Sequence, residues 1–316
     1  MGYKVLIAGA GQIGSRYLQG MVKFSEPLTI WIYDISPSAL AKIKIVWDEA
    51  CVHERHQLVP IKNLRELPET IDLSVVTTTA DIRVKLVEEI DDRCRSRFWI
   101  LEKVLVQNLN DLMRLEKIFG EGQSAWVNTP RLFWDLYRSL RQLYLGNETL
   151  NASFDGFSGL ACNAVHFIDL ICGWRNTQLE EVDTRGLSTE WFESKRLGFY
   201  EIEGTLLMRF ADGSRLKLRC YRHDQEFRAK LLVGDDQWII NESAGIAVAN
   251  DGRCIKAPIS HQSQITAPIM KDIFAGKLVG LPTVRQSMAQ HAVYLKSMLS
   301  HWNACMPDKL TSLPIT

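Results

Sequence analysis

A glycine-rich turn between a strand and a helix, near the start of the chain, constrains the fold more than any other feature. Residues 3–9 (YKVLIAG) form an aliphatic run without polar alternation, as expected of a parallel strand buried on both faces. Gly9, Gly11 and Gly14 stand at G-x-G-x-x-G spacing, and a segment with helical periodicity follows. A strand, this turn and a helix in that order predict a site for a pyrophosphate.

Each position in the turn has a physical reason. Gly9 permits the tight turn out of the strand, Gly11 lets a pyrophosphate approach the backbone, and Gly14 allows the helix to pack closely on the strand. Gln12 and Ile13 lie at the expected start of the helix, where free amide groups and the helix dipole favour a bound phosphate. We therefore expect these five residues to bind a dinucleotide.

Asp34 points to a particular dinucleotide. It closes a second predicted strand, at 28–34, about 20 residues after Gly14. A carboxylate at this place can accept hydrogen bonds from both ribose hydroxyls of an adenosine, and it repels a 2′-phosphate. NAD is therefore the expected cofactor and NADP the less favoured one, although Arg16 and Lys42 could still accommodate a phosphate.

The segments that follow keep alternating between helices and strands. They are a helix at 36–51, a strand at 71–79, a helix at 81–94, a strand at 98–104, a helix at 108–122 and a strand at 124–130. Such alternation implies a parallel sheet with helices on both faces. Together with the glycine turn it predicts an N-terminal Rossmann domain.

The pattern changes near residue 125, so we expect one domain at 1–125 and a second at 126–316. In the second half, D-G and D-D turns separate pairs of alternating runs, which are signals of antiparallel hairpins. The predicted second domain is α/β, with a large, mainly antiparallel open sheet. An open apolar sheet face usually finds a partner, so we expect this domain to bind the substrate and to form a homodimer or homotetramer.

Composition narrows the possible partners. Lys plus Arg and Asp plus Glu both number 37, so the positive charge expected of a nucleic-acid-binding protein is missing, and a small-molecule partner fits better. The seven cysteines are scattered and form no C-x-x-C pair, which favours a reducing cytoplasm over a disulfide framework. No apolar run approaches the length that a membrane span needs.

Glu102 and Lys103 stand at the end of a predicted buried strand in WILEKV. Ligands of parallel sheets bind beyond the carboxyl ends of the strands. A lysine there, near a nicotinamide, could orient a substrate hydroxyl and lower its pKa. The alternative is a lysine in a surface salt bridge at the strand end.

A polar stripe runs along an otherwise apolar predicted helix, LACNAVHFIDL. Cys162, His166 and Asp169 lie three or four residues apart and therefore share one face. In the first interpretation His166 is a general base oriented by Asp169. In the second Cys162 is a thiolate nucleophile paired with His166. In the third Cys162 is a small core filler, and His166 donates to Asp169 purely for structure.

Two further residues are candidates for substrate contacts. Asn163 is adjacent to Cys162 and carries a polar amide, although on an ideal helix it points about 100° away from the stripe. Arg131 follows the last strand of the cofactor domain and could clamp a carboxylate or a phosphate, or form a surface salt bridge. No metal site is expected, because the stripe has no obvious fourth ligand.

The motifs GAGQIGSR, TTTADI, EKV and CNAVHFIDL, with Asp34 between the first two, resemble the Gfo/Idh/MocA family of oxidoreductases in order and spacing. The resemblance covers essentially the whole chain. It implies a Rossmann domain followed by an α/β domain with a mainly antiparallel sheet, and oxidation or reduction of a sugar or cyclitol carbon with NAD(P). It adds Thr78 and Glu102 to the cofactor contacts and makes Lys103 a contact as well.

The family's E-K-P motif becomes Glu102, Lys103 and Val104, so its lysine is kept and its proline is replaced. Its D-x-G-x-H motif keeps His166 but has Cys162 in place of the catalytic aspartate. GSRYLQG near the start and the closing LPIT are most similar to a bacterial branch associated with surface-polysaccharide or sugar biosynthesis.

The expected function is hydride transfer between a nicotinamide and a secondary hydroxyl or ketone of a sugar, amino sugar or nucleotide sugar. Lys103 would polarise that oxygen, His166 would move the proton, and Asp169 would orient His166. The alternative is a catalytically altered protein that binds NAD(P) as a sensor or scaffold. The changes at Cys162 and Val104 keep this alternative open.

Overall fold

The computed structural model describes residues 2–51, 54–120, 124–146, 148–223 and 226–316, and the chain divides into two compact units. Unit 1 contains Met1–Glu102, Arg114–Asn128 and Ser260–Val284, and unit 2 contains Lys103–Met113, Thr129–Ile259 and Arg285–Thr316. Each unit therefore combines three segments, whereas the sequence predicted a single boundary between residues 125 and 126.

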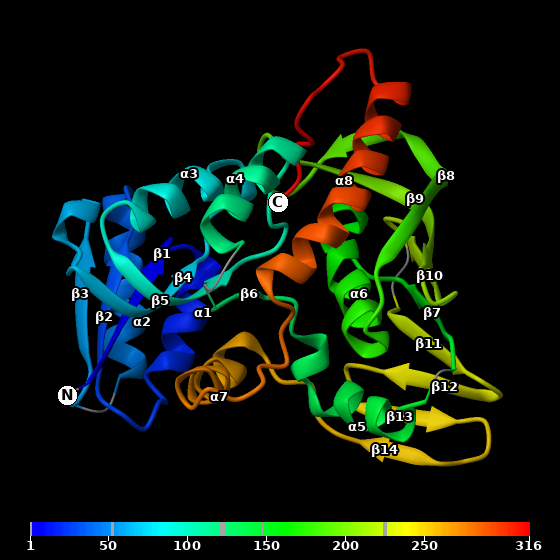
Figure 1. Ribbon diagram of the computed structural model, residues 1–316, viewed down its shortest axis with the longest axis horizontal. Coiled ribbons are helices and arrows are strands. Elements are labelled where there is room, and N and C mark those ends of the chain that lie inside the picture. The colour runs from blue at the N-terminus through cyan, green and yellow to red at the C-terminus, as the bar shows by residue number, and fades with distance from the viewer. Residues whose placement is uncertain (1, 52–53, 121–123, 147, 224–225) are drawn as a thin grey trace. The chain divides into compact units, whose positions relative to one another are not determined.

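Unit 1 is built on a six-stranded parallel sheet of order β3-β2-β1-β4-β5-β6 (Figure 1). Its strands are β1 (Tyr3–Ala8), β2 (Leu28–Tyr33), β3 (Gln57–Ile61), β4 (Thr70–Val76), β5 (Arg95–Leu101) and β6 (Ser124–Val127). Its helices are α1 (Gln12–Met21), α2 (Pro37–Ala50), α3 (Ala80–Asp91), most of α4 (Leu109–Phe119) and α7 (Gln262–Phe274), with a short 3-10 helix at Leu64–Glu66. This strand order is that of a Rossmann fold, which confirms the predicted architecture.

The central strand β1 shows why this sheet forms. Its residues Val5 to Ala8 are fully buried, as a strand covered by helices on both faces requires. Ser36 caps α2 by accepting a hydrogen bond from the amide of Ala39 at 3.3 Å, and Pro37 occupies the first helical position. The part of the predicted 108–122 helix at 121–122 lies outside the described residues.

β3 was not predicted from the sequence. It is an edge strand, and its residues are mostly exposed or half-buried, so it lacks an apolar pattern. It also contains Pro60, which is tolerated at a sheet edge because the missing amide would face solvent there.

Unit 2 is built on an eight-stranded sheet of order β14-β13-β12-β11-β7-β10-β9-β8. Its strands are β7 (Leu150–Asp155), β8 (Leu179–Glu193), β9 (Tyr200–Phe210), β10 (Arg215–Cys220), β11 (Arg228–Val233), β12 (Asp236–Asn241), β13 (Ile246–Ala249) and β14 (Cys254–Lys256). Its helices are α5 (Asp135–Leu143), α6 (Leu160–Arg175) and nearly all of α8 (Val284–Cys305), after a 3-10 helix at Pro130–Phe133. All neighbouring strands are antiparallel except β7 and β10, as a mainly antiparallel sheet requires.

Helix α6 packs against β9 and β10 on one face of this sheet, with α8 beside it (Figure 1). Residues along β9 to β13 alternate between buried and exposed, so the opposite face meets solvent. That face exposes Leu207, Ile239 and Val248 among charged side chains. The homodimer or homotetramer expected through it stays a prediction.

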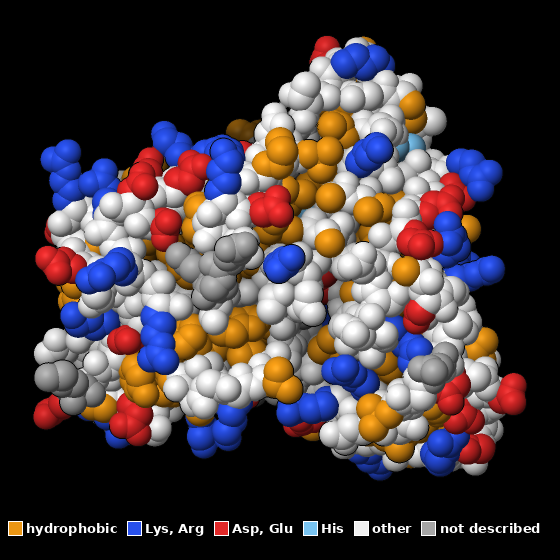
Figure 2. Space-filling view, in the orientation of Figure 1, with side chains coloured by type: hydrophobic (Ala, Val, Ile, Leu, Met, Phe, Trp, Pro, Cys, Tyr) orange, Lys and Arg blue, Asp and Glu red, His pale blue; other side chains and the backbone are white. Residues whose placement is uncertain are grey.

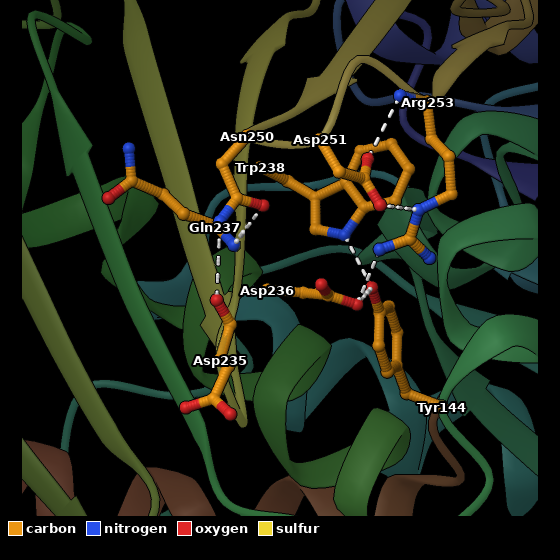
Figure 3. Close-up of polar contacts among 8 residues, drawn as sticks. All are labelled: Tyr144, Asp235, Asp236, Gln237, Trp238, Asn250, Asp251 and Arg253. Atoms are coloured by element: carbon orange, nitrogen blue, oxygen red, sulfur yellow. Dashed lines mark hydrogen bonds and ion pairs between the residues drawn. The ribbon is translucent and has the colours of Figure 1, made fainter.

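A polar network joins the end of α5 to the β12–β13 hairpin (Figure 3). The hydroxyl of Tyr144 donates to Asp236 at 2.5 Å and accepts from Nε1 of the buried Trp238 at 2.7 Å. Arg253 forms an ion pair with Asp236 at 2.7 Å. The hydroxyl therefore satisfies the indole N–H of a tryptophan that is only 1% exposed.

The surface matches the balanced composition of the sequence. Figure 2 shows basic and acidic side chains interspersed over the visible face, in line with 37 residues of each sign. In the parts of the chain that the structure describes, no helix is both long and apolar enough to cross a membrane.

Candidate active site

The glycine turn of unit 1 has the geometry that its sequence predicted. Gly9 has a φ of 114°, a conformation that residues with a side chain rarely adopt. A Cβ on Gly14 would lie 2.0 Å from the carbonyl oxygen of Gly9, so only glycine lets α1 pack this closely on the turn. A Cβ on Gly11 would meet nothing within 4 Å, so there is open space beside this backbone.

The start of α1 has the features of an anion-binding site. Gly11 caps the helix without a side-chain acceptor, and its first turn contains no acidic residue. Among the described residues, none accepts a hydrogen bond from the amides of Gln12 or Ile13. The Thr77 hydroxyl donates to the Gly9 carbonyl at 2.8 Å and fixes the turn. Two free amides at a helix start beside an open glycine turn fit a pyrophosphate.

Asp34 lies beside this turn, because the amide of Ala10 donates to its Oδ2 at 2.8 Å. Its Oδ1 accepts from the amide of Ser36, also at 2.8 Å. The two bonds fix the orientation of the carboxylate, and each oxygen keeps acceptor capacity for a further donor. The residues present therefore fit the adenosine ribose of a nicotinamide cofactor.

Asp34→Asn is expected to relax the choice between cofactors. In the unchanged protein we expect kcat/KM to be higher with NAD than with NADP, because the carboxylate repels a 2′-phosphate. The variant should narrow this ratio by about 10- to 100-fold, the range expected for losing one or two charged hydrogen bonds and the repulsion. The measurement is steady-state kinetics with both cofactors.

The exposed Asp48 on α2 supplies a matched control, since Asp48→Asn changes a carboxylate of the same unit away from the turn. An unchanged protein that prefers NADP would refute the role assigned to Asp34.

Thr78 and Glu102 follow two neighbouring strands of unit 1. Thr78 follows β4, which adjoins β1 where the strand order reverses, and such switch points are where ligands bind in these sheets. Its hydroxyl oxygen is buried without a hydrogen-bond partner among the described residues. Glu102 follows β5, is 7% exposed and accepts from Asn128 at 2.6 Å. Glu102 therefore links the end of β5 to Asn128, which belongs to the same unit.

Lys103 follows Glu102 in the chain and belongs to unit 2. Its Nζ donates to the carbonyl oxygen of Cys162 at 3.4 Å, a long hydrogen bond, and its side chain is only partly buried. The peptide between Lys103 and Val104 is cis. The hydrogen bond to Cys162 places Lys103 at the first turn of α6, one turn before His166.

His166 lies on α6 at the polar stripe that the sequence predicted. Burial lowers the pKa of its imidazole well below the usual value, and the positive charges of Arg131 and Lys103 lower it further. The imidazole is therefore neutral at neutral pH and able to take up a proton. Its Nδ1 is buried without a hydrogen-bond partner among the described residues.

Asp169 is almost fully buried one turn further along α6, with 2% of its surface exposed. Its Oδ2 accepts from the hydroxyls of Thr129 and Ser287, both at 2.9 Å. Its Oδ1 has no partner in the described parts of the chain, so the expected hydrogen bond to His166 is not formed here. Burial raises the pKa of this carboxyl to about 7, although the two hydroxyls lower it.

Asp169 should make the stability of the protein depend on pH. A carboxyl whose pKa is raised on folding keeps its proton between about pH 4 and pH 7 only in the folded state, so stability falls as the pH rises through this window. The full loss above pH 7 is on the order of 4 kcal/mol. In Asp169→Asn the urea midpoint should differ much less between pH 5 and pH 8 than in the unchanged protein.

Asp183→Asn is the control, because Arg185 lowers the pKa of Asp183 to about 2 and the residue does not titrate in this range. The same pH difference in Asp169→Asn as in the unchanged protein would contradict the assignment.

Cys162 has the wrong environment for a nucleophile. Burial raises the pKa of its thiol to about 12, and Lys103 lowers it only in part. A reactive cysteine needs a lowered pKa. The thiolate interpretation is therefore disfavoured, and Cys162 keeps its proton.

Arg131 and Asn163 are engaged within the protein. Arg131 forms an ion pair with Glu242 at 3.2 Å, with only 12% of its side chain exposed, and its guanidinium lies 4.0 Å from the ring centre of Phe167. Asn163 donates its amide to the carbonyl of Ser158 at 2.7 Å. Arg131 thus acts on His166 through its charge, and a direct substrate contact by either residue stays a prediction.

Glu201 was missed from the sequence. It lies on β9, is 7% exposed, and accepts from the amides of Ala161 and Cys162 at 2.7 and 3.2 Å. In the sequence it stands in an alternating strand among ordinary surface acids, so only its position against the start of α6 distinguishes it. Within the residues that the structure describes, no three His, Cys, Asp or Glu side chains are placed to hold a metal ion.

Comparison with solved structures identifies the fold. The scyllo-inositol dehydrogenase of Lactobacillus casei, with bound NAD(H) and scyllo-inositol, matches with a TM-score of 0.66 and 14% identity, over 93% of this chain and 95% of that one. The myo-inositol 2-dehydrogenase of Lactobacillus plantarum gives 0.69 and 14%, over 96% and 98%. The UDP-N-acetylglucosamine 3-dehydrogenase of Acidithiobacillus ferrooxidans gives 0.71 and 12%, over 94% and 96%. The chain has the fold of these dehydrogenases.

This dehydrogenase fold extends over both units and nearly the full length of each neighbour, which confirms the predicted fold class. No family model matches the sequence, and no curated protein matches it.

Proposed function

We propose that the protein is a member of the Gfo/Idh/MocA family and an NAD-dependent oxidoreductase. Its substrate is a secondary alcohol, or the corresponding ketone, of a cyclitol, sugar or nucleotide sugar. The observation that carries the proposal is the placement of Lys103, which directly follows the nucleotide-binding unit and reaches the α6 turn before His166. The solved neighbours act on inositols and on a UDP-sugar, which supports this substrate class.

In the direction of oxidation, the neutral imidazole of His166 takes the hydroxyl proton as the carbon loses hydride. Its Nδ1 is enclosed by protein, which leaves Nε2 to exchange the proton with a substrate. When bound, the nicotinamide supplies the hydride acceptor. The ammonium of Lys103 donates a hydrogen bond to the substrate oxygen and stabilises the negative charge that develops there.

Asp169 supports His166 in this proposal. Oδ1 of Asp169 and Nδ1 of His166 are both buried and unbonded among the described residues, and they lie one turn apart on the same face of α6. A small rotation would let Nδ1–H donate to Oδ1. That bond would fix the tautomer with a free lone pair on Nε2, as a general base requires.

The experiment is a turnover screen of the purified protein with NAD and NADP. The panel contains inositols, free hexoses, amino sugars and UDP-hexoses, and formation of reduced cofactor is recorded. We expect turnover with at least one cyclic polyol class. Tight binding of NADH without turnover of any class would instead favour a sensor or scaffold.

A further inference from the structure

Glu201 is a buried carboxylate that takes no part in the proton transfer proposed above. It extends from β9 to the first turn of α6 and accepts the two backbone amides there. An ordinary surface acid would cap a helix from solvent, but Glu201 is 7% exposed. Burying a carboxylate is costly unless charges and hydrogen bonds compensate.

Two polar side chains, those of Cys162 and Asn163, converge with Glu201 at one point. Gly159, with a φ of 75°, immediately precedes α6. A Cβ on Gly159 would lie 2.9 Å from Sγ of Cys162, 3.0 Å from Nδ2 of Asn163 and 3.0 Å from Oε1 of Glu201. The absence of a side chain at Gly159 therefore lets the carboxylate approach Cys162 directly.

The titratable groups around Glu201 indicate which residue its charge acts on. The titratable groups that face it from the elements packed against it, among the described residues, are Lys103, Cys162 on α6 and Tyr294 on α8. Burial raises the pKa of Glu201, and the Cys162 thiol, the Ala161 and Cys162 amides and the Lys103 charge oppose this rise. Only Lys103 is a cation, and its Nζ donates to the backbone of the residue that Glu201 caps.

We propose that Glu201 is a positioning residue that holds the ammonium of Lys103 over the first turn of α6. It thereby supplies the carboxylate that the family motif has at the position of Cys162. This inference rests on the proposed function, because it acts through Lys103 on the substrate oxygen. In this chain the carboxylate beside Lys103 comes from strand β9 and not from helix α6.

The test is Glu201→Gln, which keeps the size and one acceptor but removes the charge. We expect kcat to fall by about 10- to 100-fold with little change in KM, since an ammonium out of place weakens stabilisation of charge in the transition state.

The double variant Cys162→Asp with Glu201→Gln should recover at least part of kcat, because it restores a carboxylate beside Lys103. Glu203→Gln, on the same strand, is the control and should match the unchanged protein. If Glu201→Gln lowers only thermal stability and leaves kcat unchanged, the carboxylate is merely a helix cap and the inference is wrong.

Lys103→Met separates this inference from the proposed function. Full activity in Lys103→Met would refute the proposed function itself. Loss of activity in Lys103→Met, with an unaltered kcat in Glu201→Gln, would refute only the role of Glu201.

Discussion

Replacing Lys103 by methionine is expected to lower kcat by about 100- to 10,000-fold, the range measured when a positioned proton donor or charged hydrogen bond is removed. Methionine keeps the length and apolar stem of the side chain but cannot donate to the substrate oxygen. The affinity for NADH should fall less than kcat does, because the glycine turn and Asp34 supply the other expected cofactor contacts. Steady-state kinetics and a fluorescence titration with NADH measure the two effects.

Lys296→Met is the matched control, since Lys296 is an exposed lysine of α8 in the same unit. It should behave as the unchanged protein does. Near-full turnover in Lys103→Met would remove this lysine from the mechanism.

His166→Asn should cause a loss of similar size, about 100- to 10,000-fold in kcat, because the amide cannot take up a proton. The direction of the pKa shift adds a second expectation. The imidazole of the unchanged protein stays neutral to well below pH 6.5. As the pH is lowered, kcat should therefore begin to fall only below the pH at which an ordinary histidine becomes protonated. The measurement is the pH dependence of kcat for both proteins.

His301→Asn is the control for this substitution. His301 is a partly buried histidine of unit 2 whose pKa burial also lowers, and it lies on α8 beside Cys305. An acid limb near the value of a free imidazole, or equal losses in both variants, would contradict the role of His166.

The fold of the Rossmann half was predictable because its signals are local. Gly9 and Gly14 act through backbone conformation and close packing within one strand, turn and helix, and Asp34 follows the next strand. A short stretch of sequence therefore contains the whole requirement. The polar stripe on α6 was predictable for the same reason, since helical spacing alone puts Cys162, His166 and Asp169 on one face.

The remaining features depend on residues distant in the sequence. The partners of Asp169 come from Thr129 and from Ser287 on α8, and no periodicity indicates them. Glu201 reaches α6 from a strand about 40 residues away, and the ion pair that engages Arg131 comes from Glu242. Each unit contains three separate segments of the chain. A single change in the sequence pattern near residue 125 could not predict this division.

Following the transferred hydrogen tests the central claim most directly. Each member of the substrate panel is prepared with deuterium on its ring carbons and incubated with the protein and NAD, and the reduced cofactor is analysed by mass spectrometry. We expect deuterium to appear on the nicotinamide with the true substrate, and to be absent with Lys103→Met on the same timescale. Protein that binds NADH but transfers deuterium from no member of the panel would contradict a dehydrogenase function.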